Sequence, residues 1–285
     1  MKYKPKLKFN YSKANYLNYE VIGDGQIPLV FLHGFGASLR GWDDVIAHLP
    51  QDIFTSYLID LKGSGFSSKP KDTKYSIDDQ AFLISAFIKK NNLREYTLIG
   101  HSLGGGVSLF VALRLLDDKH FIPKKLILID AAAYNTDLPF FVDKIRIPLL
   151  NHIILNFTSS KFRVKYTLNH IIYHKDKITP ELVGRYAYFM NLENYNYALI
   201  KTAKNIIPKD FNAYTSRYPN IDIPTSIIWG KNDPALPLAL GEQLLEELPN
   251  AKLHILNECG HNPHEEYPEE VARLIVSFTK SKHGE

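Results

Sequence analysis

Short, unbroken apolar runs recur along the first half of this chain and again near its end, and they constrain its fold more than any other feature. Six such runs are predicted as strands: Leu29–Leu32, Tyr57–Ile59, Thr97–Ile99, Leu126–Ile129, Ser226–Trp229 and Leu253–Leu256. A strand that is apolar on both faces is typical of a parallel sheet covered by helices on both sides.

Amphipathic stretches follow these runs and supply the covering helices. Ser76–Lys90 has an apolar face at helical spacing and opens on Ser76-x-x-Asp79, a capping-box pattern. Leu103–Leu116, Gly241–Leu248 and Glu269–Phe278 are the other predicted helices. The alternation of strand and helix predicts an α/β fold with a mostly parallel central sheet.

The segment between the two blocks differs in composition. From about Tyr134 to Tyr218 no strand-like run is bounded by turns, and the segment is rich in Phe and Tyr. Thr179-Pro180 is typical of a helix start. We therefore expect three parts: the first part of an α/β core over residues 1–133, a helical lid over 134–218 and the second part of the core over 219–285. Some aromatic side chains of the lid are expected to line an apolar pocket.

Composition and charge exclude several classes of protein. With 45% hydrophobic and 22% charged residues among 285, the chain is expected to be globular. Neither a signal peptide nor a run of about 18 apolar residues is found, so a cytoplasmic protein without stable membrane insertion is expected.

The basic cluster Lys2, Lys4, Lys6 and Lys8 is interpreted as a solvated leading segment, and no nucleic-acid partner is expected. The single cysteine, Cys259, excludes an internal disulfide and a multi-cysteine metal site.

The strongest candidate for chemistry is Gly100-His101-Ser102-Leu103-Gly104. This segment directly follows a predicted strand and precedes a predicted helix. A serine on such a tight turn presents its hydroxyl as a nucleophile, and the flanking glycines let backbones approach where a Cβ would clash. The pattern therefore predicts Ser102 as a catalytic nucleophile.

His261 and Asp233 are predicted to complete a catalytic triad. A serine is a weak nucleophile until a base takes its proton. His261 lies in the loop after the last predicted strand, and Asp233 lies four residues beyond Trp229, which ends the preceding one. Both therefore belong at the carboxyl edge of the sheet, where Asp233 would accept the Nδ1–H bond of His261. Asp130, at the end of another predicted strand, is the alternative acid.

The loop His33-Gly34-Phe35-Gly36 is predicted to supply an oxyanion hole. It follows the first predicted strand, and the backbone N–H groups of Phe35 and Leu103 would form the donor pair. His33 is expected to brace this loop, whereas His101 is expected to pack or hydrogen-bond rather than to exchange protons.

These motifs resemble those of the α/β-hydrolase superfamily, in the chain order Ser, Asp, His and over about 200 residues outside the lid. The nucleophile turn, the acid loop Trp229–Asp233 and the histidine segment Gly260–Glu269 each have a counterpart there. Asp60–Ser67 is similar to the superfamily's D-x-R-G-x-G-x-S turn, with Lys62 in place of the usual arginine, which would weaken the ion pairing of that turn. Asp60 is expected to hold the turn together. The resemblance implies the α/β-hydrolase fold.

The predicted function is hydrolysis of small to medium hydrophobic carboxylic esters through an acyl-enzyme intermediate, with no metal or organic cofactor. No Arg or Lys cluster adjoins the catalytic motifs to hold a dianionic substrate, with Arg185 and Lys201 in the lid as the available exceptions. The serine nucleophile argues against haloalkane dehalogenases and epoxide hydrolases, which use an aspartate there.

Three alternatives stay open. Carbon–carbon bond hydrolases of ring-cleavage products share the fold and triad, and Ile178–Leu182 resembles their lids, but they usually carry Trp after the catalytic His, where this chain has Asn262. A perhydrolase or acyltransferase would use the same triad. A ligand-sensing protein with slow or no turnover is the alternative from another class. The sequence leaves the oligomeric state open.

Overall fold

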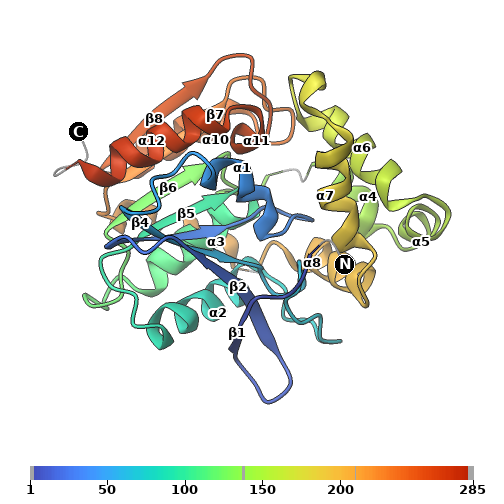
Figure 1. Cartoon of the computed structure of the whole chain (residues 1–285), viewed down its shortest axis with the longest axis horizontal. Helices are drawn as coiled ribbons and strands as arrows, with labels where there is room; N and C mark the ends of the chain where they lie inside the picture. The colour runs from blue at the N-terminus through green and yellow to red at the C-terminus, as the bar shows by residue number, and fades with distance from the viewer. Residues whose placement is uncertain (1–2, 137–138, 209, 282–285) are drawn as a thin grey trace.

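The computed structural model describes residues 3–136, 139–208 and 210–281, which form a central eight-stranded sheet (Figure 1). The strand order is β1-β2-β4-β3-β5-β6-β7-β8. The strands are β1 (Leu7–Asn10), β2 (Tyr16–Ile22), β3 (Ile27–Leu32), β4 (Phe54–Ile59), β5 (Thr97–His101), β6 (Lys125–Ile129), β7 (Thr225–Gly230) and β8 (Ala251–Leu256). β1 and β2 pair antiparallel with their neighbours, and β3 to β8 are parallel.

Helices cover both faces of the parallel strands, which is why these strands are apolar on both sides. Val30 and Leu32 of β3 pack in one core cluster with α2 (Ile77–Lys90), α3 (Leu103–Arg114) and α10 (Leu238–Glu247). Leu29 and Phe31 pack in a second cluster with α1 (Asp43–Ile46) and α12 (Pro268–Lys280) on the opposite face. The alternation follows from the two-residue period of a strand. The predicted α/β-hydrolase fold is confirmed.

The first two strands were not predicted, and they add to the interpretation of the N-terminal lysines. β1 lies at the edge of the sheet, where Lys6 pairs with Glu20 at 3.3 Å and the Lys8 ammonium lies 4.2 Å from the centre of the Tyr16 ring. Lys4, Lys6 and Lys8 are exposed, as expected for a solvated segment, and the structure adds that Lys8 belongs to an edge strand. Lysines on an edge strand discourage pairing with another chain. Of the predicted cluster, Lys2 lies outside the described residues.

A run of helices lies between β6 and β7 and stands beside the sheet on the right of Figure 1. These helices are α4 (Phe140–Arg146), α5 (Pro148–Phe157), α6 (Ser160–Ile171), α7 (Pro180–Met190), α8 (Tyr195–Asn205) and α9 (Phe211–Thr215), and we refer to them as the helical insertion. Thr179 caps α7 by accepting a hydrogen bond from the Leu182 N–H at 3.1 Å. Within the described part of the chain, no helix is both long and apolar enough to cross a bilayer.

A buried carboxylate holds the turn after β4. Asp60 Oδ1 accepts a hydrogen bond from the Leu39 N–H, and Oδ2 accepts one from the Phe66 N–H, both at 2.8 Å. Gly65 lies against this carboxylate with a φ of +49°, and a Cβ at this position would lie 2.1 Å from the Asp60 carboxyl group. The turn therefore needs both the aspartate and the glycine.

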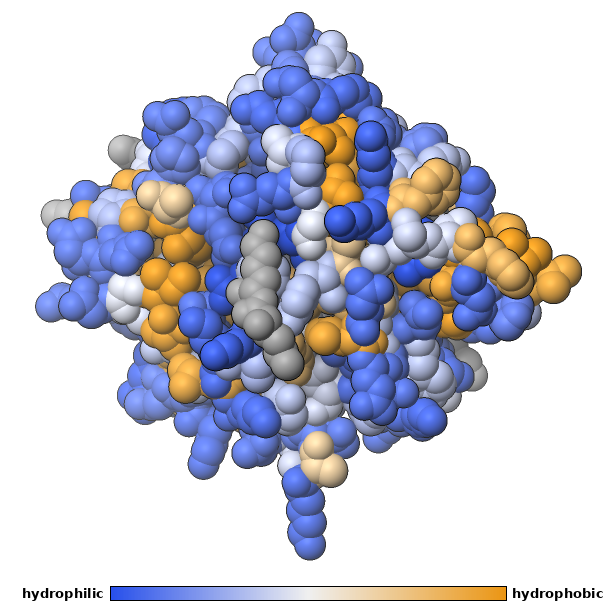
Figure 2. Space-filling model, turned by 45° about the vertical axis from the view of Figure 1, so that its right-hand side comes forward, coloured by the Kyte–Doolittle hydropathy of each residue, from blue (hydrophilic) through white to orange (hydrophobic). Residues whose placement is uncertain are grey.

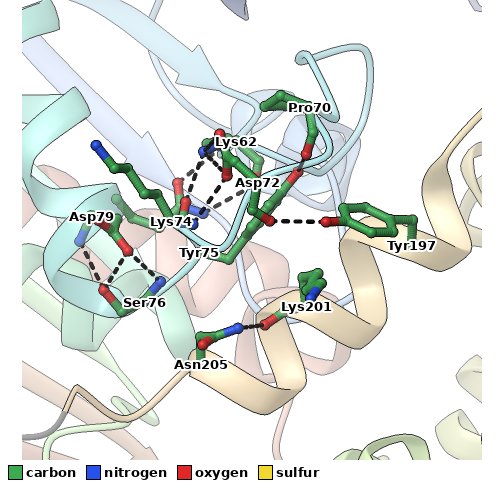
Figure 3. Close-up of polar contacts among 11 residues, drawn as sticks. Lys62, Pro70, Asp72, Lys74, Tyr75, Ser76, Asp79, Tyr197, Lys201 and Asn205 are labelled. Carbon is green, nitrogen blue, oxygen red and sulfur yellow. Dashed lines mark hydrogen bonds and ion pairs between the residues drawn. The ribbon is translucent and has the colours of Figure 1, made fainter.

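Lys62 connects the same turn to the helical insertion (Figure 3). Its buried ammonium donates to both carboxylate oxygens of Asp72, at 2.8 and 2.9 Å, and lies 4.5 Å from the centre of the Tyr75 ring. The Tyr197 hydroxyl of α8 donates to the backbone carbonyl of Asp72 at 3.0 Å. Lys62 thus retains an ion pair in this turn and fixes the loop that α8 contacts.

We expect Gly65→Ala to lower the free energy of unfolding by about 2 kcal/mol or more, because the added methyl group must displace the Asp60 carboxylate. Gly184→Ala in α7 is the matched control, since no atom lies within 4 Å of the added Cβ. It is expected to raise stability by about 0.5–1 kcal/mol, as alanine does in a helix interior. Urea unfolding followed by circular dichroism measures both changes, and similar effects of the two substitutions would contradict the prediction.

Candidate active site

The candidate nucleophile lies on a strained turn between β5 and α3. Ser102 has φ 51° and ψ −117°, and its N–H donates to the Ile129 carbonyl of β6 at 2.9 Å. A Cβ on Gly100 would lie 2.3 Å from the Gly104 carbonyl oxygen, and one on Gly104 would lie 2.2 Å from the Leu32 carbonyl oxygen. The two glycines therefore let the strand and the helix approach closely enough to hold the serine in this conformation.

The three predicted triad residues meet at the carboxyl edge of the sheet. The Ser102 hydroxyl donates to His261 Nε2 at 3.0 Å, and His261 Nδ1–H donates to Asp233 Oδ2 at 2.7 Å. Asp233 Oδ1 accepts hydrogen bonds from the backbone N–H groups of Ala235 at 2.7 Å and Leu236 at 3.0 Å. His261 and Asp233 are both buried. The geometry is that of a serine whose proton a buried, oriented imidazole can accept.

The predicted oxyanion loop lies beside the same serine. Gly34 and Phe35 line the cavity in front of Ser102, and Leu103 is the first residue of α3. The first N–H groups of a helix have no partner within the helix, which makes the Leu103 N–H beside Ser102 a candidate oxyanion donor. His33 braces the loop as expected, because its Nδ1–H donates to the Gly34 carbonyl at 2.8 Å and its Nε2 accepts from the Leu61 N–H at 3.1 Å.

Comparison with known proteins agrees with this geometry. Residues 27–268 match the family model described as the alpha/beta hydrolase fold. The chain belongs to the α/β-hydrolase family. It is 27% identical to the uncharacterized hydrolase YugF of Bacillus subtilis (strain 168), over 90% of this chain and 91% of that protein. It is also 27% identical to a 2-hydroxy-6-oxononadienedioate/2-hydroxy-6-oxononatrienedioate hydrolase of Cupriavidus pinatubonensis, over 90% of this chain and 88% of the relative.

A solved structure shows the same fold. The meta-cleavage product hydrolase from Pseudomonas fluorescens IP01 matches with a TM-score of 0.78 and 20% identity, over 96% of this chain and 97% of that one. At this identity the likeness concerns the fold of the hydrolase, and the chemistry must be argued from its own residues.

In the present structure, Asp130, the alternative acid, lies beside Ser102, His261 and Asp233. Its carboxyl group makes no hydrogen bond to the His261 imidazole. Its Oδ1 accepts a hydrogen bond from the Gly230 N–H at 3.0 Å, and among the described groups its buried Oδ2 accepts none. Complete burial and the neighbouring Asp233 hold the pKa of Asp130 well above its usual range. Burial therefore disfavours the charged form of Asp130, and Asp233 is the carboxyl group that bonds His261.

Asp130, Asp233 and His261 are also the one group of described residues whose ligand atoms lie close enough together to hold a metal ion, within 4.8 Å of one another. The 2.7 Å between His261 Nδ1 and Asp233 Oδ2 is a hydrogen-bond distance. Two ligands of a tetrahedral zinc ion would be separated by roughly 3.3 Å. The spacing therefore fits a shared proton better than a shared cation.

Two further histidines pack around the triad and stay neutral. The His101 Nε2–H donates to the His261 carbonyl at 2.8 Å, and the His101 ring lies 4.3 Å from that of His264, measured between ring centres. Burial lowers the pKa of His101 well below its usual value and that of His264 to about 3. His101 thus hydrogen-bonds and packs, as predicted, and the sequence had not singled out His264.

Glu266 joins the catalytic histidine loop to the insertion, a role that the sequence did not reveal. The buried carboxylate accepts hydrogen bonds from the Gly260 N–H at 2.8 Å and from the Tyr173 and His174 N–H groups at 2.9 Å. The His261 N–H donates to the Ile171 carbonyl at 2.7 Å. In the sequence, the only signal was that Glu266 belongs to the histidine segment Gly260–Glu269. The position of the base therefore depends on the end of α6.

Two more contacts attach α7 to the core. The Tyr186 hydroxyl donates to Glu265 Oε1 at 2.8 Å, and Asn262 Nδ2 donates to Glu265 Oε2 at 2.7 Å. Burial raises the pKa of Glu265 to about 7. Arg185 forms an ion pair with Asp44, with its closest nitrogen–oxygen distance at 2.8 Å. Arg185 is therefore a structural contact between the insertion and the core and not a cavity residue.

The cavity over Ser102 has a volume of about 380 Å³ and is closed mostly by apolar side chains of the insertion. From the insertion it is lined by residues that include Ile145, Leu150, Ile154, Leu155, Phe162, Tyr166, Leu168 and Leu199. Its two cationic lining residues are engaged: Arg163 donates to the Thr158 carbonyl at 2.5 Å, and the Lys144 ammonium lies 5.6 Å from the centre of the Tyr166 ring. Lys201 does not line the cavity.

The thiol of Cys259 is buried, and burial raises its pKa.

We expect Asp233→Asn to lower kcat by roughly 10⁴-fold, because an amide can neither fix the His261 tautomer nor stabilise the imidazolium. Asp130→Asn is expected to retain activity within about tenfold, since the Asp130 carboxyl group bonds the Gly230 N–H and not the imidazole. Steady-state kinetics of both variants on the same ester show which of the two carboxyl groups assists His261. Equal losses would show that the two carboxyls act as one charged unit.

We expect the stability that His264 contributes to fall by about 2 kcal/mol between pH 7 and pH 5. The unfolded chain binds a proton at this histidine below its usual pKa of 6.5, whereas the folded protein excludes it down to about pH 3. Glu265, with its raised pKa, acts in the opposite direction, so the quantity to measure is the difference in unfolding free energy between wild type and His264→Gln at each pH. A difference that does not change with pH would contradict the neutral state of His264.

Proposed function

We propose that the protein is a serine hydrolase of small to medium apolar carboxylic esters, with the helical insertion as its lid. The observation that carries the proposal is the unbroken chain of hydrogen bonds from Asp233 through His261 to the Ser102 hydroxyl, which opens on an apolar cavity of about 380 Å³. A volume in this range accommodates a small organic ligand.

The reaction would proceed through an acyl-enzyme. Ser102 Oγ attacks the ester carbonyl carbon while its proton passes to His261 Nε2, and the Asp233 carboxylate stabilises the resulting imidazolium. The oxyanion is stabilised by the N–H groups of Phe35 and Leu103. His261 then protonates the leaving alkoxide as the carbon–oxygen bond breaks. Water, deprotonated by the same imidazole, releases the acid and restores the Ser102 hydroxyl.

The charge distribution around the cavity favours a neutral substrate. A substrate with two carboxylates needs cations in the cavity lining, and of its two, Arg163 already donates to the Thr158 carbonyl at 2.5 Å, while the ammonium of the exposed Lys144 lies near the Phe140 and Tyr166 rings. The aliphatic lining, by contrast, would gain from each methylene group buried in it. An ester with an apolar acyl chain therefore fits the cavity best.

Carbon–carbon bond hydrolysis is the second candidate, favoured by the names of six relatives. A hydrolase that is 27% identical over 90% of this chain acts on 2-hydroxy-6-oxononadienedioate or its trienedioate analogue, according to its name. The same Ser102–His261 pair would serve that reaction. Two features of this chain argue for the ester instead: the mostly apolar lining of the cavity and Asn262 directly after the predicted catalytic histidine.

We expect wild-type protein to hydrolyse p-nitrophenyl esters, and Ser102→Ala to lose more than about 10³-fold of that activity. From acetate toward decanoate, kcat/KM is expected to rise by up to about fourfold for each added methylene until the cavity is filled. Release of p-nitrophenol gives both results. Activity that survives Ser102→Ala would overturn the assignment of the nucleophile.

A fluorophosphonate probe and a 2-hydroxy-6-oxo dienoate distinguish ester hydrolysis from carbon–carbon hydrolysis and from ligand sensing. Labelling of Ser102 with turnover of the dienoate but of no ester would support carbon–carbon hydrolysis. Labelling with turnover of neither would support a ligand-sensing protein. Absence of labelling in a folded protein would contradict the activated serine altogether.

A further inference from the structure

The outer surface of the insertion exposes an unusual concentration of large apolar side chains. Half of the exposed large hydrophobic residues among those described lie between positions 147 and 166: Ile147, Leu149, Ile153, Phe157, Phe162 and Tyr166. Leu149 and Phe157 are the most exposed, at 74% and 77%. Figure 2 shows hydrophobic residues gathered at its right-hand edge, the side on which the insertion stands in Figure 1. A patch of this kind marks an interaction surface.

Helix α5 is apolar toward the interior and also toward solvent. Leu149, Ile153 and Phe157 recur at a spacing of four residues and so form one exposed stripe. An adjoining side of the helix contributes Leu150 and Ile154 to the cavity. A helix that is apolar toward solvent as well as toward the interior is expected to have an apolar partner on its exposed stripe.

Charge indicates what this partner is. Residues 139–171 contain five lysines and arginines and one acid, a net charge of +4 that equals the net charge of the whole chain. The rest of the protein is therefore neutral overall. Lys144 and Arg146 precede the stripe and Lys161 and Lys165 follow it, all four exposed. The acid, Asp143, is paired with Arg146 at 3.1 Å.

An apolar stripe bordered by cations fits the interface of an anionic bilayer. The apolar side chains would enter the boundary between headgroups and acyl chains, and the cations would meet the lipid phosphates. A second copy of this chain fits less well, because a symmetric dimer through the same face would bring its concentrated positive charges together.

We propose that the outer face of α4–α6 is a docking surface for anionic lipid bilayers, to which the protein binds peripherally and reversibly. Phe162 and Tyr166 are exposed on this face and also line the cavity over Ser102, so docking places the rim of the cavity at the lipid. An apolar ligand then passes between bilayer and cavity without crossing water. The proposal concerns binding alone and does not depend on the proposed ester hydrolysis.

The test is co-sedimentation of the full chain carrying Ser102→Ala with vesicles of phosphatidylcholine, alone or with one third phosphatidylglycerol. Binding is expected to the anionic vesicles, with weaker binding to the neutral ones and a marked loss at about 0.5 M salt. Leu149→Ser combined with Phe157→Ser is expected to weaken binding at least tenfold. Lys161→Gln with Lys165→Gln should weaken it by about fivefold for each lysine removed.

Matched substitutions on other surfaces control for a general effect of surface polarity. Phe82→Ser with Leu245→Ser removes two exposed apolar side chains from α2 and α10, and Lys124→Gln removes an exposed cation before β6. These variants are expected to bind vesicles as the parent does. On a wild-type background, Leu149→Ser with Phe157→Ser should leave hydrolysis of a water-soluble acetate ester unchanged, because neither side chain lines the cavity.

Three results would overturn the proposal. The first is no binding of the parent protein to anionic vesicles at low salt. The second is undiminished vesicle binding by the variant Leu149→Ser combined with Phe157→Ser, which would locate the lipid contact elsewhere on the protein. The third is a dimer of the parent protein in light scattering that these same two substitutions convert to a monomer, which would show that a second copy covers the face.

Discussion

The tight turn at Ser102 is the constraint on which the rest of this structure depends. A serine at φ 51° is tolerated only where its surroundings hold it, and here β6 accepts its N–H while Gly100 and Gly104 permit close contact between strand and helix. In the sheet order, β5 lies between β3 and β6. This order brings the oxyanion loop to one side of the serine and the acid and base loops to the other.

The base is positioned by the insertion as well as by the sheet. His261 follows β8 at one end of the sheet, yet its backbone N–H bonds the Ile171 carbonyl, and Glu266 fixes both sides of that junction. A Cβ on Gly260 would lie 2.1 Å from the same carbonyl oxygen, so the glycine is required by the insertion and not only by the loop. Movement of the end of α6 would therefore alter the distance between His261 and Ser102.

The sequence predicted the core more fully than the site. Most of the parallel strands were predictable because helices cover both faces and their runs are apolar, whereas β1 and β2 were missed because polar and apolar residues are mixed along them. Ser102, His261 and Asp233 could be predicted since each follows a strand end, and the structure brings them together. The burial of Asp130 beside Asp233 and the role of Glu266 depend on contacts between distant segments, which no local pattern encodes.

The buried histidines around the triad serve its acid–base chemistry by remaining uncharged. The His101 and His261 rings are 5.0 Å apart between centres, so a protonated His101 would oppose the transfer of the serine proton to His261. Burial prevents this, since it lowers the pKa values of His101, His264 and His33. Burial beside Asp233 also raises the pKa of Asp130, which disfavours a second negative charge there. In the proposed reaction, the positive charge formed on His261 would have the Asp233 carboxylate as its counter-charge in contact.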